Sequence, residues 1–235
     1  MTGAPVLIVQ HEPGEGPGLL GRALDDAGIT RRLVRTFAGE PVPRTLGDAA
    51  GLVVLGGSMA VYEQERHPHL GHELELLRDA LRRKRPILGL CLGSQLLAAA
   101  LGGTVAKAKA KELGWYRVRL APAAADDALL SGAPPDFVAF HWHGDACPLP
   151  PGAVQLASST LTRCQAFRAG TNAWGFQFHP EVDEEIIGAM VSGGADELAS
   201  EGVDGAQLLA AAARELPRVR DSFGAAFARW IQLLT

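Results

Sequence analysis

The chain has 235 residues, of which 47% are hydrophobic, and its formal net charge is −4. This length fits one α/β domain, and the hydrophobic content excludes a disordered chain. The basic residues form no long stripe, so no nucleic acid is expected as a partner.

The three cysteines are odd in number, are far apart and lack CxxC spacing, which favours neither a disulfide framework nor a zinc site. Two of them, Cys147 and Cys164, are expected to be buried by packing. Residues 1–9 lack the basic region and apolar stretch of a signal peptide, and no apolar run is long enough to span a membrane. We therefore expect a cytoplasmic protein with no membrane partner.

In the first half of the chain, short apolar runs alternate with amphipathic segments. Strands are predicted at 6–9, 32–37, 52–55 and 87–90, and helices at 19–27, 69–85 and 92–101. Gly28 and Pro86 are the predicted stops of the first two helices. Strands that alternate with helices predict an α/β fold with a flavodoxin-like open sheet, mostly parallel, and helices on both faces.

The second half contains short strands with few helices between them, predicted at 115–120, 137–143, 154–159, 165–168 and 174–179. These strands favour a mixed or antiparallel extension of the same sheet. Beyond Glu181, helices are expected up to Thr235, with an interruption at Pro217. No long linker divides the chain, so we expect a single domain over 1–235, with its motifs within 5–185 and a C-terminal helical segment over 186–235.

The most informative stretch is Gly89-x-Cys91-x-Gly93, where an apolar strand meets a helix. Such a turn forces strained backbone angles on its central residue and brings the flanking segments close together, so it needs small residues on both sides. It would present the Cys91 sulfur at the carboxyl end of the sheet, where the amides of the following helix favour the thiolate. A buried packing cysteine is the alternative.

A cysteine that attacks an amide needs a base, and the base needs an acceptor that fixes its tautomer. His179 and Glu181 lie two residues apart at the end of a predicted strand, so their side chains project to the same side. We predict His179 as the base and Glu181 as its orienting carboxylate. The strand at 52–55 ends at Gly56 and Gly57, where bare amides can face an oxyanion, although a simple turn would look the same.

With these pieces in order, the chain resembles the class I (triad) glutamine amidotransferases, especially the stand-alone members similar to GMP synthase. Gly89-x-Cys91-x-Gly93-x-Gln95 looks like the nucleophile motif, Gly56-Gly57 like the oxyanion strand and His179-Pro180-Glu181 like the closing motif. Three further segments are similar to segments of those members: Glu112-Leu113-Gly114-Trp115, His141-Trp142-His143-Gly144-Asp145 and Gln165-Ala166-Phe167.

The resemblance implies that the Cys91 thiolate attacks the γ-carboxamide of glutamine and forms a γ-glutamyl thioester. The amides of Gly57 and Leu92 are the predicted oxyanion donors. Gly56 and Gln95 would line the substrate site, and the backbone around His141 and Trp142 would hold the α-carboxylate. No cofactor and no metal is implied.

Three features suggest other sites, and we discount them. Ser192 to Asp196 is similar to a nucleotide-binding loop, but too little chain follows, so a helix break is expected. His67, His69 and His72 have no carboxylate or cysteine that completes a metal site. The group of His141, His143 and Asp145 is assigned to the substrate pocket or to structure rather than to a metal.

Three functions stay open. The first is an amidotransferase subunit that passes ammonia to a separate synthase. The second is a self-contained hydrolase of γ-glutamyl amides or peptides, and the third is a binding or regulatory module without catalytic activity. An intact triad argues against the third function. A reactive-cysteine chaperone or peptidase of a related fold leaves the late His-Pro-Glu segment unexplained.

Overall fold

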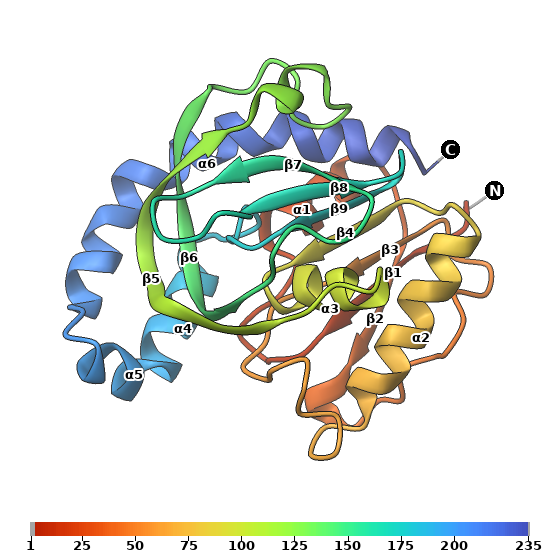
Figure 1. Cartoon of the computed structure of the whole chain (residues 1–235), viewed down its shortest axis with the longest axis horizontal. Coiled ribbons are helices and arrows are strands. Elements are labelled where there is room, and N and C mark those ends of the chain that lie inside the picture. Colours follow the sequence, from red (N-terminus) through yellow and green to blue (C-terminus); the bar gives the residue numbers. More distant parts are fainter. Residues whose placement is uncertain (1–2, 235) are drawn as a thin grey trace.

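One mixed nine-stranded sheet, with helices on both of its faces, forms the core of the computed structural model, which describes residues 3–234 (Figure 1). The strands are β1 (Val6–Gln10), β2 (Arg31–Arg35), β3 (Gly51–Val54), β4 (Ile87–Leu90), β5 (Ala106–Leu120), β6 (Asp136–Ala146), β7 (Ala153–Ser158), β8 (Ala166–Ala169) and β9 (Ala173–Phe176). The helices are α1 (Gly18–Asp26), α2 (His69–Arg82), α3 (Leu92–Ala100), α4 (Glu184–Gly193), α5 (Ala195–Ser200) and α6 (Gly205–Gln232).

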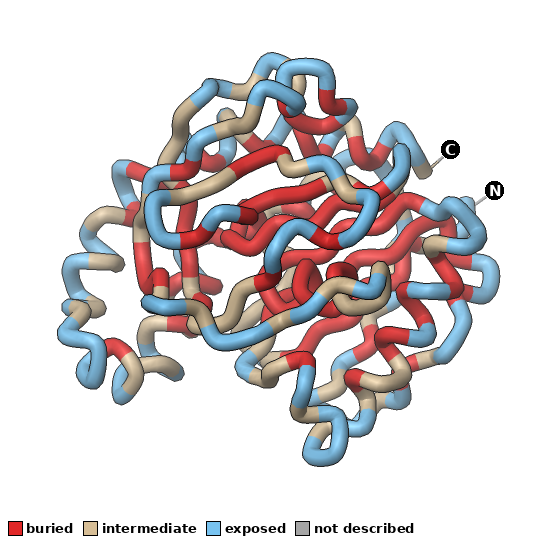
Figure 2. The backbone as a smooth tube through the Cα atoms, viewed as in Figure 1, coloured by how far each residue is buried: buried red, intermediate tan, exposed pale blue. Residues whose placement is uncertain are grey.

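The strand order is β2-β1-β3-β4-β9-β8-β7-β5-β6. The strands from β2 to β9 in this order run parallel, whereas each pair from β9 to β6 is antiparallel. The four-residue β3, β4 and β9 and the five-residue β1 are fully buried (Figure 2), as expected for parallel strands covered on both faces. The predicted α/β sheet with an antiparallel extension is therefore confirmed.

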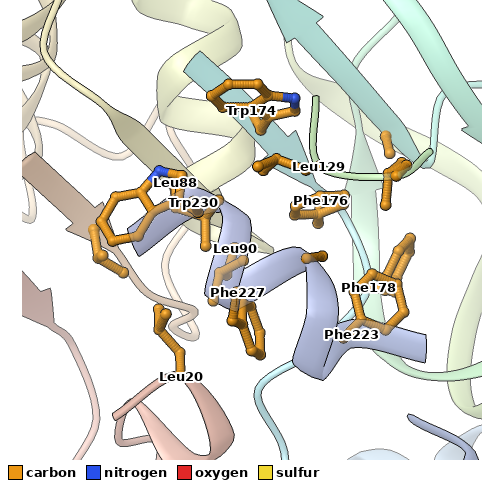
Figure 3. Packing of buried hydrophobic residues seen from close by; sticks show 14 of the residues in the cluster. Leu20, Leu88, Leu90, Leu129, Trp174, Phe176, Phe178, Phe223, Phe227 and Trp230 are labelled. Atoms are coloured by element: carbon orange, nitrogen blue, oxygen red, sulfur yellow. The ribbon is translucent and has the colours of Figure 1, made fainter. Parts of the chain in front are cut away.

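Each face of the sheet has its own hydrophobic core, because alternate residues of a strand point to opposite sides. Val6 and Ile8 of β1 pack with α1 and α6, whereas Leu7 and Val9 pack with α2 and α3. On the α6 side the core is strongly aromatic (Figure 3), with the rings of Phe223 and Phe176 6.0 Å apart.

The predicted interruption at Pro217 is wrong, because α6 runs unbroken through it. Proline removes one amide donor, but the affected turn is exposed and water can satisfy the freed carbonyl. Leu216 and Val219, on either side of the proline, are buried against the rest of the protein and keep the helix in register. Asp204 caps the helix by accepting a hydrogen bond from the amide of Ala206 at 2.9 Å.

Several strand boundaries differ from the prediction, and β6 extends to Ala146, three residues beyond its predicted end. β2 ends at Arg35, and a 3₁₀ turn over Thr36–Ala38 replaces its predicted end. β5 begins at Ala106, nine residues before the predicted start, because this exposed segment gains its order by pairing with β6. β9 ends at Phe176, and His179 instead forms an isolated bridge with Phe140.

Other predictions hold. α4 ends at Gly193 and α5 begins at Ala195, which confirms the break at 192–196. Cys147 and Cys164 are buried as expected, and they belong to the same hydrophobic cluster despite their separation in the sequence. In the part of the chain that the structure describes, no helix is both long enough and apolar enough to cross a membrane.

Candidate active site

Cys91 lies at the turn between β4 and α3, where its backbone has φ +49° and ψ −109°. A non-glycine residue with positive φ is strained. A Cβ on Gly93 would lie 1.9 Å from the carbonyl oxygen of Val54, and one on Gly89 would lie 2.5 Å from that of Gly93. Glycine is therefore required at both positions, because backbone atoms approach too closely for any side chain. The sequence predicted the turn for this reason.

His179 and Glu181 meet beside this turn. His179 Nδ1 donates a hydrogen bond to Glu181 Oε1 at 2.8 Å, and the two residues are 1% and 2% exposed. Burial lowers the pKa of His179, but the charges of Glu181 and Cys91 raise it, and the result lies well above the ordinary value. His179 Nε2 has no hydrogen-bond partner among residues 3–234, and the residue lines the same cavity as Cys91.

The loop between β1 and α1 supports the His179-Pro180-Glu181 motif through backbone contacts. The amide of Leu19 donates to the carbonyl of Glu181 at 2.7 Å. Gly18 has φ +42°, and a Cβ there would lie 2.1 Å from the same carbonyl. No larger residue fits at this position, so Gly18 is part of the support for Glu181.

His11 holds the Gly56–Gly57 peptide in place through a hydrogen bond. His11 Nδ1 donates to the carbonyl of Gly56 at 2.8 Å, and His11 Nε2 donates to Glu73 Oε2 at 2.9 Å. A trans peptide points its carbonyl and its amide in opposite directions, so the amide of Gly57 points away from His11. Gly57 lines the cavity, and this is the orientation that the predicted oxyanion role requires.

His11 donates at both ring nitrogens only as an imidazolium. Burial lowers its pKa, but the charge and hydrogen bond of Glu73 outweigh burial and raise it. His69 Nδ1 also contacts Glu73, at 2.9 Å from Oε1. The expectation that no carboxylate accompanies His67, His69 and His72 is therefore wrong, because one turn of α2 places Glu73 beside His69 and the end of β1 brings in His11.

Two predicted substrate residues line a cavity of about 920 Å³ together with Cys91 and His179. Gln95 Nε2 donates to the carbonyl of Asp145 at 3.1 Å. The carbonyl of Trp142 lies 3.5 Å from Cys91 Sγ. The indole Nε1 of Trp142 donates a hydrogen bond to Glu197 on α5. Gly56 lies directly beside the site, since a Cβ on it would be 2.9 Å from His179 Cε1.

His141 is fully buried and is not part of the cavity wall. Alternation along β6 turns its side chain to the face opposite that of Trp142. There it joins His143 and Glu112, whose ligand atoms all lie within 4.8 Å of one another. The third member of the group is thus Glu112 and not Asp145, because Glu112 on β5 is paired in register with His143 on β6.

The carboxylate of Glu112 is ionised within this buried group. Burial raises the pKa of Glu112, but His143, whose Nε2 lies 3.2 Å from Glu112 Oε2, and the nearby hydroxyls of Thr162 and Ser159 outweigh burial and hold the pKa at about 2. Burial and the charge of His143 lower the pKa of His141 to about 3, so His141 is neutral at physiological pH. Two histidines and a carboxylate are donor types that suit a divalent transition metal, whereas in the group of His11, His69 and Glu73 the imidazolium of His11 has no lone pair for one.

Sequence reasoning did not identify His11, Glu73 or Glu15. None belongs to a motif with the nucleophile or the base, and their proximity depends on where β1, α2 and the following loops end. Glu15 Oε2 would lie 2.8 Å from a Cβ on Gly56, and His179 Cε1 would lie 2.9 Å from the same Cβ, so Glu15 lies beside the predicted base. The position of Glu15 within a glycine- and proline-rich loop after a buried strand was the only local signal.

Several known proteins have sequences similar to that of this chain. The sequence profile of the family described as glutamine amidotransferase class-I matches residues 20–191. The glutamine amidotransferase-like protein YfeJ of Salmonella typhimurium is 32% identical over 197 residues, which cover 83% of this chain and 82% of that protein. The glutamine-hydrolysing GMP synthase of Leifsonia xyli is 37% identical over 65% of this chain, but the match spans only 31% of that enzyme.

A crystal structure of a glutamine amidotransferase from Thermotoga maritima has a similar fold. Its TM-score with this chain is 0.88 at 31% sequence identity, and the superposition covers 98% of both chains.

Proposed function

The chain belongs to the class I glutamine amidotransferase family, and on that premise we propose that it hydrolyses the γ-amide of glutamine or of a γ-glutamyl compound. The observation that carries this proposal is that Cys91 and His179 line one cavity and that Glu181 holds His179 from behind the cavity wall. A thiol, an imidazole with a free Nε2 and a buried orienting carboxylate are the parts that a thioester mechanism needs.

The proposed reaction has two halves. The Cys91 thiolate attacks the γ-carbonyl carbon, and the amides of Gly57 and Leu92 stabilise the tetrahedral oxyanion. His179, held by Glu181, protonates the leaving nitrogen, and the C–N bond breaks to give a γ-glutamyl thioester and the free amine or ammonia. Water then gives a proton to His179 and attacks the thioester, which releases glutamate and restores the thiol.

Two forms of this function differ in the fate of the leaving amine. In the first, the amine is ammonia, and a separate synthase receives it. In the second, the chain is a self-contained hydrolase of γ-glutamyl amides or peptides. The cavity volume of about 920 Å³ favours the second form, because a cavity of this size holds a ligand larger than one amino acid. We further propose that residues 1–235 act as one domain in a reducing, cytoplasmic compartment.

The test is glutamate release by the purified chain from L-glutamine and from a panel of γ-glutamyl peptides, beside Cys91→Ala. We expect Cys91→Ala to abolish turnover and to keep the fold. Cys164→Ala, which removes a buried thiol away from the cavity, is the matched control and should stay active. Added hydroxylamine should intercept the thioester as a γ-glutamyl hydroxamate. Turnover by a folded Cys91→Ala variant would disprove the assignment.

A further inference from the structure

The wall of the cavity is strongly acidic. One lysine, Lys107, lines it, and six carboxylates line it, from Glu12, Glu15, Glu63, Asp145, Asp196 and Glu197. Ion pairs neutralise part of this charge, since Lys111 Nζ lies 2.7 Å from Glu197 Oε1 and Arg66 lies 3.7 Å from Glu63. For the other four, no cationic side chain within residues 3–234 comes within ion-pair distance.

Two of the unpaired carboxylates, Glu12 and Glu15, lie on the loop after β1, next to the catalytic group. Glu15 is half-buried, and burial raises its pKa. Repulsion from Glu181 and Glu12 raises the pKa of Glu15 further, whereas attraction to His179 lowers it. The net shift of this pKa is upward. Glu12 Oε1 accepts a hydrogen bond from Ser58 Oγ at 2.6 Å, just beyond the oxyanion turn. Glu12 and Glu15 therefore place two carboxylates beside His179, and such an acidic patch favours the binding of a cation.

A second observation concerns the side of the cavity on which the leaving amine lies. His179 is 1% exposed, its Nε2 has no partner within the described chain, and the residue lines this cavity. In the proposed mechanism this nitrogen protonates the leaving amine, so the leaving group lies on the His179 side of the Cys91 sulfur. That side is where Glu15 approaches His179, whereas Gln95 and Asp145 lie together on another part of the wall.

We propose that the chain hydrolyses γ-glutamyl amides whose leaving amine carries a second, positively charged group, such as a diamine, and that Glu12 and Glu15 receive this cation. The inference rests on the proposed γ-glutamyl hydrolase function and adds the class of its substrate. Water is consumed, the γ-amide bond breaks, and glutamate and the free diamine leave. Asp145 is available for the α-ammonium of the glutamyl half, which leaves the carboxylates of the β1 loop for the second cation.

The experiment compares two substrates of the same length. One is the γ-glutamyl amide of 1,4-diaminobutane, and the other is the γ-glutamyl amide of pentylamine, in which a methyl group replaces the ammonium. We expect kcat/KM to be at least about 10-fold higher for the cationic amide, and the difference to shrink as salt rises from about 0.01 M to about 1 M, since the Debye length falls from ~30 to ~3 Å.

Charge-removing variants identify the residues responsible. Glu12→Gln and Glu15→Gln should each reduce the ratio of kcat/KM for the cationic and neutral amides by several-fold. Glu65→Gln removes the same charge from an exposed residue outside the cavity and should leave the ratio unchanged.

The possible failures can be distinguished. Equal kcat/KM for the two amides, with Cys91-dependent glutamate release from both, would overturn the cationic substrate class and keep the proposed function. A ratio that Glu12→Gln and Glu15→Gln leave unchanged would overturn the assignment of these two carboxylates. Absence of Cys91-dependent glutamate release from every substrate, glutamine included, would overturn the proposed function and this inference with it.

Discussion

Replacing His11 by leucine removes the donor that holds the carbonyl of Gly56 and leaves the Gly56–Gly57 peptide free to rotate. The lost bond has a charged donor and is buried, so it contributes about 1.5–3 kcal/mol. This free energy corresponds to a bias of roughly 10- to 150-fold toward the observed peptide plane. An oxyanion donor contributes about 10²–10³-fold to kcat, which sets the upper limit of the loss.

We therefore expect His11→Leu to lower kcat by about 10- to 100-fold with little change in KM, because the oxyanion exists only in the transition state. His11→Asn should recover most of the loss, since the asparagine Nδ2 donates from nearly the position of the imidazole Nδ1. The assay is steady-state glutamate release over a range of substrate concentrations, with urea unfolding to establish that each variant is folded.

His69→Leu provides the comparison, because it removes the other histidine on Glu73 and leaves the bond to Gly56 in place. Its effect on kcat should be much smaller than that of His11→Leu. A folded His11→Leu variant with the kcat of the parent chain would refute the role of His11 as a positioning residue. Equal losses in His11→Asn and His11→Leu would refute the role of the donated hydrogen bond.

Two further predictions concern stability. Glu112 has a folded-state pKa of about 2 against an ordinary value of 4.5, so its contribution to stability is present above about pH 4.5 and is lost as the pH falls toward 2. The free energy of unfolding should fall more steeply over this window for the parent chain than for Glu112→Gln, and parallel curves from urea titrations would contradict the pairing. Pro217→Ala should raise the free energy of unfolding by about 1–3 kcal/mol, because it restores a helical hydrogen bond at an exposed turn. Thermal or urea unfolding measures the change, and a destabilised variant would show that the proline is required.

The turn at Cys91 was predictable because its causes are local. Gly89 and Gly93 flank Cys91 and allow a close approach of backbone atoms that no larger residue permits, and the five residues from Gly89 to Gly93 are enough to indicate it. His179 and Glu181 were predictable for the same reason, since two positions on one extended segment share a side. Their meeting with Cys91 requires β4 and β9 to be neighbours, which the family resemblance supplied.

Groups that depend on strand register were not predictable. Glu112 faces His143 because β5 and β6 pair antiparallel with an irregularity after Lys107, and a shift of one residue would turn Glu112 away. Asp145 was predicted to accompany His141 and His143 because it is close to them in the sequence. That prediction did not consider residues of the neighbouring strand β5. The start of β5 was missed because its lysines and alanines carry no buried face.

α6 shows the opposite kind of error. A proline is a strong local signal, and it predicts a break when read alone. The buried residues that follow it, such as Val219 and Phe223, pack against the sheet and the strands beyond it, and this packing outweighs the loss of one hydrogen bond.

The position of β9 has a consequence for how the chain folds. β9 is the last strand in the sequence, yet it lies between β4 and β8 in the middle of the sheet. Until residues 173–176 leave the ribosome, β4 and β8 each present an unpaired edge to other chains. A nascent chain that stalls before Ala173 therefore exposes two unpaired strand edges that can pair with other chains. Refolding must insert β9 between β4 and β8, which precede it in the sequence. Aggregation during synthesis should depend on this insertion more than on the stability of the finished protein.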